Sequence, residues 1–159
     1  MAFPKIFFCS SSHPRHQRSV LREIVASGNI WLIKPNVDEL SQVLGEQVKD
    51  TAGSVAKAGR KLFDKVEIVL ISRGRKGAIV VTKKGAWHGR CAGRRKVLST
   101  VGCGDYLLAG FLKGLEDSSN TAVALRTAIK AATAKAWGWT ETTPWPKVQR
   151  QIQVQLRRI

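Results

Sequence analysis

The residues with the clearest chemical potential are Ser99–Asp105 (STVGCGD), which stand directly before the apolar run Tyr106–Leu112. Two glycines one residue apart allow a tight turn that exposes consecutive backbone N–H groups. A helix that begins behind this turn adds its own unpaired N–H groups and the positive end of its dipole. The spacing therefore predicts a pocket for an anion, most often a phosphate.

Asp105 stands at the edge of this predicted pocket. A carboxylate there can accept the proton of a hydroxyl that attacks a phosphate. The alternative is an ordinary turn in which Asp105 only caps the helix. A thiol among helix N-terminal amides ionises readily, so we also expect Cys103 to react faster than a free cysteine.

Two further motifs precede the glycine loop, within Trp31–Leu40 (WLIKPNVDEL) and Ile68–Val81 (IVLISRGRKGAIVV). In this order, "KPNVDEL", "VLISRGRKGAIVV" and "STVGCGDYLLAGFL" resemble the C-terminal half of the ribokinase-like (PfkB) carbohydrate kinases. The sequences of these motifs are similar to those of the branch that phosphorylates sugar phosphates, such as fructose-1-phosphate kinase and tagatose-6-phosphate kinase. The resemblance extends from about Val20 to about Trp137.

The resemblance implies a role for each residue of the glycine loop. Gly102, Cys103 and Gly104 would form the anion hole for the transferring phosphate, and Asp105 would be the catalytic base. The family usually has small residues where Cys103 and Tyr106 stand. Tyr106 would therefore crowd the acceptor sugar.

The segment Asn36–Glu39 matches the family's Asn-x-x-Glu motif, which implies that Glu39 helps to organise Mg²⁺, often through water. One nearby carboxylate suffices, because Mg²⁺ keeps several waters and prefers a few carboxylate and phosphate oxygens. The alternative is a helix start rich in acids, which the helix dipole favours.

The resemblance implies ATP and Mg²⁺ as cofactors, and Ser72–Gly74 resembles the turn that contacts the nucleotide. Arg73 or Arg75 would face phosphate, although a hairpin turn on a basic surface explains Arg75 equally well. Ligands of α/β sheets lie beyond the carboxyl ends of the strands, where most of these residues are expected. The predicted nucleotide-binding residues are Lys34, Asn36, Ser72, Arg73, Gly74, Gly77 and Thr100.

The hydrophobic patterns predict the elements that would position these residues. Helices are expected over 19–27, 37–44, after Thr51, over 105–115 and over 120–137, with strands over 30–33, 67–72, 77–82, 86–90 and 95–98. This alternation, with one hairpin at the Lys83–Gly85 turn, predicts an α/β layered fold with a mostly parallel sheet. The resemblance implies that this fold is the Rossmann-like fold of the ribokinase type. We expect residues 1–19 to form a loose basic arm and residues 20–159 the C-terminal, ATP-binding half of a PfkB-type kinase domain.

One predicted helix is unusually small-sided, with Ala131, Ala132, Ala134 and Ala136. A comparable late helix of the family flanks the adenine, which small side chains allow to approach. Tight packing against another helix explains the same residues.

The chain carries 27 Lys and Arg against 11 Asp and Glu, a formal net charge of +16. Such an excess attracts polyanions, and nucleic acid is the first candidate. The basic residues are scattered, however, and ATP or a sugar phosphate satisfies the charge equally well, so we do not expect nucleic acid as a partner. No apolar stretch is long enough to cross a bilayer, and an odd number of cysteines without metal-ligand spacing predicts reduced thiols in the cytoplasm.

Complete members of the family carry a preceding half with the sugar-binding residues and a small lid, and residues 1–19 do not resemble it. We therefore interpret the chain as a truncated product or a separately encoded half. The predicted activity is ATP-dependent phosphoryl transfer to a sugar or sugar-phosphate hydroxyl, with very poor turnover by this chain alone. The alternative is a non-catalytic remnant that binds nucleotide or polyanions. An exposed sheet edge predicts a homo-oligomer or a complementary N-terminal half as partner.

Overall fold

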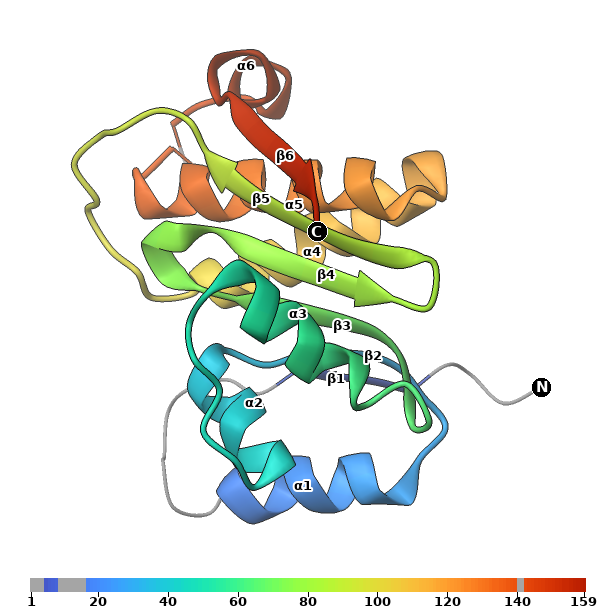
Figure 1. Ribbon diagram of the computed structural model, residues 1–159. Helices are drawn as coiled ribbons and strands as arrows, with labels where there is room; N and C mark the ends of the chain where they lie inside the picture. Colours follow the sequence, from blue (N-terminus) through green and yellow to red (C-terminus); the bar gives the residue numbers. More distant parts are fainter. Residues whose placement is uncertain (1–4, 9–16, 140–141) are drawn as a thin grey trace. The chain divides into compact units, whose positions relative to one another are not determined.

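The computed structural model describes residues 5–8, 17–139 and 142–159 (Figure 1). It divides into two compact units. The first unit comprises Met1–Gly74, Ile79–Ala86 and Arg158–Ile159, and the second comprises Arg75–Ala78 and Trp87–Arg157.

The first unit contains the strands β1 (Lys5–Phe8), β2 (Ile30–Lys34), β3 (Val66–Ser72) and most of β4 (Ala78–Thr82), which neighbour one another in this order. Strands β1 and β2 pair in parallel, and so do β2 and β3. Parallel neighbours need long crossover connections. Helix α1 (Gln17–Ser27) makes the first crossover, and helices α2 (Val37–Leu44) and α3 (Ala52–Arg60) make the second.

Local sequence signals fix the ends of the two helices in the second crossover. The Asn36 side chain caps α2, and Gly45 ends it with a φ of 69°. The Thr51 side chain caps α3 by accepting a hydrogen bond from the Ser54 N–H. Behind these helices lies one apolar core, to which Leu40, Val55 and Val69 contribute fully buried side chains.

The second unit contains most of β5 (Gly85–Cys91) and β6 (Val154–Arg158), with helices α4 (Cys103–Ser118), α5 (Thr121–Ala136) and α6 (Trp145–Gln151). Helices α4 and α5 lie side by side (Figure 1). They approach closely because glycines of α4 face alanines of α5: a Cβ at Gly114 would lie 2.5 Å from the Cα of Ala124, and one at Gly110 would lie 2.9 Å from the Cβ of Ala131. Tight packing therefore accounts for at least Ala131 in the alanine-rich helix.

The sheet is mixed, whereas the sequence predicted a mostly parallel one. Residues 73–77 join β3 to β4, a link too short for a parallel crossover, whereas residues 83–84 form the predicted hairpin between β4 and β5. Strand β6 also runs antiparallel to β5, because the Ala92 N–H donates to the Gln153 carbonyl and the Ile159 N–H donates to the Ala86 carbonyl.

Three other expectations about the elements need correction. Part of the predicted loose arm, Lys5–Phe8, is strand β1. The predicted strand over 95–98 is absent from the described structure, where residues 92–102 follow an irregular path. Helix α6 and strand β6 were not predicted. Among the helices that the structure describes, none has both the length and the apolar character needed for a membrane crossing.

Candidate active site

Gly102 forms the turn that starts the glycine loop's helix. It is the N-cap of α4 and adopts a left-handed conformation, with φ 77° and ψ −5°, and no side chain caps the helix. A Cβ at Gly102 would lie 3.5 Å from the Lys135 Cε, an ordinary contact distance. The backbone conformation, rather than lack of space, therefore requires glycine here.

The turn leaves two amide groups free to bind a ligand. The N–H groups of Asp105 and Tyr106 both donate to the Gly102 carbonyl at 3.0 Å, and the Cys103 N–H donates to the Thr100 carbonyl at 3.2 Å. Among the described residues, no acceptor lies within hydrogen-bond distance of the Gly102 or Gly104 N–H. These two donors and the helix dipole suit an anion.

Asp105 lies in the first turn of α4 with its side chain exposed. Its carboxylate makes no capping hydrogen bond, because Gly102 holds the N-cap position. The alternative in which Asp105 serves only as a helix cap is therefore not what the structure shows. The carboxylate is free to accept a proton from a bound hydroxyl.

The prediction of a readily ionised Cys103 is wrong. Burial raises the pKa of the Cys103 thiol, and the positive charge of Lys135 opposes this rise only in part. The thiol also lies 3.6 Å from the Ser99 carbonyl, to which it can donate. Burial and the hydrogen bond to the Ser99 carbonyl both favour the protonated thiol over the thiolate.

The path into the glycine loop is anchored to the carboxyl end of α5. The Leu98 N–H donates to the Ala136 carbonyl at 2.8 Å. The Arg95 guanidinium lies 4.7 Å from the ring centroid of Trp139 and 5.6 Å from that of Trp137. These long-range contacts, rather than pairing with a neighbouring strand, determine the course of residues 95–98.

The first unit brings the KPN segment and the Ser72 turn together. Asn36 and Ser72 form a parallel β-bridge, and the Ser72 N–H donates to the Pro35 carbonyl at 3.0 Å. Lys34 ends β2 in the same segment and is only 6% exposed. Within the part of the chain that the structure describes, its ammonium has no hydrogen bond or ion pair.

Asn36 and Glu39 form a capping box at the start of α2. The Glu39 N–H donates to Asn36 Oδ1 at 2.8 Å, and the Asn36 N–H donates to Glu39 Oε2 at 2.9 Å. Among the described residues, no cluster of three or more His, Cys, Asp or Glu side chains could hold a metal ion. One half-buried carboxylate with a second oxygen to spare still fits Mg²⁺, which takes its other ligands from phosphates and water.

Arg73 has a structural partner that the sequence did not reveal. Its Nε donates to Asp50 Oδ1 at 2.7 Å, its Nη2 donates to the Asp50 carbonyl at 3.1 Å, and its side chain is 4% exposed. Gly74 follows with φ 55° in an open position.

In the second unit, Gly77 has φ 87°, and a Cβ there would lie 2.0 Å from the Gly89 carbonyl oxygen. Gly77 is therefore required by the close approach of two backbone segments.

The predicted site residues thus form two groups, one in each unit. Lys34, Asn36, Glu39, Ser72, Arg73 and Gly74 belong to the first unit, and Gly77, Thr100, Gly102, Cys103, Gly104 and Asp105 belong to the second. The structure adds Lys135 of α5 to the second group, since it contacts the glycine loop from another helix. Only the weak signal of a basic residue in a helix's last turn marks Lys135 in the sequence.

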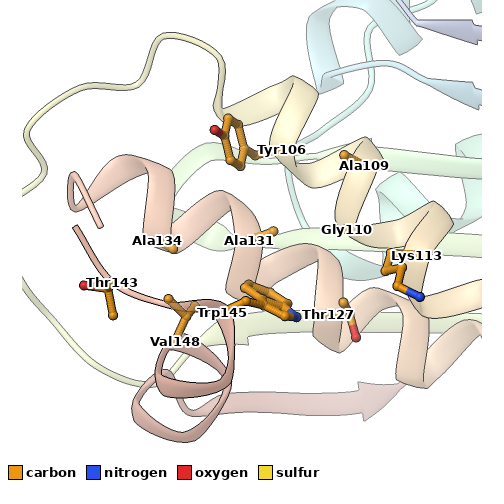
Figure 2. Close-up of a pocket in the computed structure, with 10 residues that line it drawn as sticks. All are labelled: Tyr106, Ala109, Gly110, Lys113, Thr127, Ala131, Ala134, Thr143, Trp145 and Val148. Atoms are coloured by element: carbon orange, nitrogen blue, oxygen red, sulfur yellow. The ribbon is translucent and has the colours of Figure 1, made fainter. Parts of the chain in front are cut away.

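A pocket of about 290 Å³ lies beside α4, α5 and α6 of the second unit. Figure 2 shows the residues that line it, among them Tyr106 and Lys113 of α4, Ala134 of α5 and Trp145 of α6. Most of the lining is apolar, and none of the predicted catalytic residues contributes to it. Ala131 and Ala134 therefore serve both helix packing and this pocket.

Comparison with known proteins identifies the class. Residues 5–137 match the family described as pfkB family carbohydrate kinase. The chain is 34% identical over 103 residues to the 1-phosphofructokinase of Haemophilus influenzae, an alignment that covers 64% of this chain and 33% of the relative. It is 29% identical over 154 residues to the D-tagatose-1-phosphate kinase of Bacillus licheniformis, which covers 95% of this chain and 45% of the relative.

A solved structure agrees with these sequence relatives. The phosphofructokinase-2 of Escherichia coli, in complex with substrates and products, superimposes with a TM-score of 0.73 at 26% identity, covering 84% of this chain and 41% of that one. The chain belongs to the pfkB family of carbohydrate kinases, so the predicted family and its α/β fold of the ribokinase type are confirmed. The match begins at residue 5, inside the predicted arm, and the chain spans less than half of each of these relatives.

Proposed function

We propose that this chain supplies the nucleotide-binding and phosphoryl-transfer residues of a kinase that moves a phosphoryl group from ATP to a hydroxyl of a sugar or sugar phosphate. The glycine loop carries the proposal. Its left-handed Gly102 leaves the N–H groups of Gly102 and Gly104 without an acceptor among the described residues, and the exposed carboxylate of Asp105 stands in the same helical turn.

Phosphoryl transfer depends mainly on positioning and on stabilising the charge of the transferred group. The free N–H groups of the loop, with Cys103 and Thr100 beside them, would hold the transferring phosphate. Asp105 would take the proton of the attacking hydroxyl. The Gly102 and Gly104 N–H groups and the Asp105 carboxylate are available for these roles, since they have no competing hydrogen bonds among the described residues.

We also propose the motif residues of the first unit as nucleotide-binding residues, because they match the motifs of the family. Lys34, a residue only 6% exposed, offers an ammonium without a partner among the described residues, and Asn36, just beyond β2, lies beside Ser72 at the end of β3. Glu39 would hold Mg²⁺ through its remaining oxygen, and the ion would neutralise phosphate charge. Arg73 would act by holding the turn of Ser72 and Gly74 in place, since Asp50 occupies its guanidinium.

The acceptor is proposed from the names of the relatives. Because two relatives are named 1-phosphofructokinase and D-tagatose-1-phosphate kinase, fructose 1-phosphate and tagatose 1-phosphate are the acceptors to test first. Tyr106 is 39% exposed and directly follows the proposed base, so it would limit the size of the acceptor.

The length of the match bears on turnover. Because this chain spans 33% and 45% of the two relatives named above, we propose that ATP and the sugar meet productively only with a complementary N-terminal half or a second copy present. Holding both reactants in line is a large part of catalysis. We expect the chain alone to bind MgATP weakly and to turn over very slowly.

A non-catalytic role is the second candidate, and the net charge of +16 favours it. A surface with such an excess of positive charge attracts polyanions in a salt-dependent manner. Salt-sensitive RNA binding that MgATP does not displace, without any sugar-dependent ATP turnover, would support this candidate over the kinase.

The test of the kinase proposal combines binding with turnover. Calorimetry at low salt should show saturable MgATP binding by the folded chain. With a complementary N-terminal half supplied, Asp105→Asn should abolish sugar-dependent turnover and leave MgATP affinity intact or slightly improved, because a negative charge near the phosphates is removed. Full turnover by Asp105→Asn would rule out its role as base.

A further inference from the structure

Lys135 reaches the glycine loop from the last turn of α5. Its Cε lies 3.5 Å from the position that a Cβ of Gly102 would occupy. Its Nζ lies 5.5 Å from the ring centroid of Tyr106. Gly102 and Tyr106 bracket the first turn of α4, so a positively charged side chain from one helix lies over the N-terminus of another.

The ammonium of Lys135 has no carboxylate partner among the described residues. Its positive charge lowers the pKa of the Cys103 thiol and so opposes the rise that burial causes. The ammonium is therefore close enough to act electrostatically on a residue of the loop. The side chain is half-buried. A cation thus stands beside two unused amide donors and the positive end of a helix dipole.

These groups are all of the kind that binds an anion. Lysine acts on phosphate as a compact positive charge, complementing backbone N–H groups that provide directed hydrogen bonds. Among the described residues, no carboxylate lies within ion-pair distance of the ammonium, although Asp105 stands in the same turn of α4. A bound phosphate would supply the ammonium with the directly paired anion that it lacks.

We propose that Lys135 is a phosphate-binding residue of the glycine loop, its ammonium pairing with an oxygen of the same phosphate group that the Gly102 and Gly104 N–H groups hold. The inference rests on the proposed function and assigns it one residue that lies outside the three sequence motifs. The ligand class is the polyphosphate portion of a nucleoside triphosphate.

Two other contacts of Lys135 need no ligand. A lysine in the last turn of a helix complements the dipole of its own helix, and an ammonium near an aromatic ring gains a cation–π attraction. Both of these contacts would contribute only to the stability of the fold. A measurement of phosphate affinity therefore distinguishes a phosphate-binding role of Lys135 from a purely structural one.

The test compares Lys135→Met and Lys135→Arg with the matched control Lys113→Met in the full chain. Lys113 lies on α4 and pairs with Glu116 and Asp117, so its replacement removes the same charge without touching the loop. Calorimetry at low salt would measure the binding of MgATP and of inorganic tripolyphosphate, and circular dichroism would confirm folding. Tripolyphosphate reports on the phosphate site without any contribution from the adenine.

We expect Lys135→Met to weaken binding of both ligands about tenfold and Lys135→Arg to stay within about threefold of the wild type, because arginine keeps the charge. Lys113→Met should stay within about twofold, since it alters only a surface charge that salt screens.

Unchanged affinity of folded Lys135→Met, or equal loss in Lys135→Met and Lys135→Arg, would overturn the role of Lys135 while leaving the proposed function in place. A wild-type chain that binds tripolyphosphate but not MgATP would contradict the proposed function. In that case the tripolyphosphate affinities of Lys135→Met and Lys135→Arg would still support or overturn the role of Lys135. A wild-type chain that binds neither ligand would overturn both.

Discussion

The two groups of motif residues differ in what the fold does with their polar groups. In the first unit, Asn36 and Glu39 satisfy each other, and Asp50 holds Arg73. In the second unit, the N–H groups of Gly102 and Gly104 and the Asp105 carboxylate are left unused among the described residues. The first group therefore chiefly stabilises the fold around the motif, whereas the second group leaves polar groups available to a ligand.

The largest effect is expected from Gly102→Val. A residue with a side chain at φ 77° is strained by about 1–2 kcal/mol, and the turn would relax and close the anion pocket. We expect MgATP binding to fall below detection in calorimetry. Gly53→Ala is the control, because Gly53 lies in α3 with an ordinary φ and open space around it. Wild-type affinity in Gly102→Val would contradict the assignment of the loop.

Arg73→Met should reveal the stabilising role of the first group. The substitution leaves Asp50 without its buried partner, and we expect a loss of about 2 kcal/mol in the free energy of unfolding, less than for a fully buried pair because Asp50 is 36% exposed. Urea denaturation measures this loss. Lys61→Met is the control, since its ion pair with Glu46 is exposed and should contribute under about 1 kcal/mol. Unchanged stability with strongly reduced MgATP affinity would instead make Arg73 a direct phosphate ligand.

Asn36→Ala should have a smaller effect on stability. It removes the side chain that caps α2, at a cost of about 1 kcal/mol in the free energy of unfolding. Asp105→Ala is the matched comparison in the other unit. It removes no capping bond, so we expect little change in the urea midpoint. Equal destabilisation by both substitutions would remove the distinction between the two groups.

The smallest effect concerns the pH dependence of Cys103 alkylation. Because burial raises the pKa of this thiol, its reaction with iodoacetamide should be slow at neutral pH and accelerate only above the range of an ordinary cysteine. Lys135→Met removes the charge that lowers the pKa, so its rate profile should move further to high pH. Mass spectrometry of the Cys103 peptide measures the rate. A shift of the profile to lower pH would contradict the contact between Lys135 and the loop.

Local signals made much of this fold predictable. The helices predicted over 37–44 and after Thr51 are present as α2 and α3, and the residues that bound them, Asn36, Gly45 and Thr51, act within a few positions of sequence. The Gly-x-Gly-Asp spacing similarly located the start of α4, although its helix begins at Cys103 rather than at Asp105.

The parts that sequence reasoning missed depend on partners far along the chain. Residues 95–98 follow Trp137, Trp139 and the Ala136 carbonyl instead of forming a strand. The pairing of Arg73 with Asp50 and the approach of Lys135 to Gly102 likewise join distant positions. The shift in the Cys103 pKa was predicted with the wrong sign, because helix N-terminal amides can be read from the sequence but burial cannot.

Amide NMR of the ¹⁵N-labelled chain during an MgATP titration is the most direct test of whether the glycine loop binds the phosphates. We expect the amide signals of Gly102 and Gly104 to shift most within the second unit, because their N–H groups, which have no acceptor among the described residues, would donate to a charged phosphate oxygen. Saturable binding of MgATP that leaves both of these signals unmoved would contradict phosphate binding by the loop.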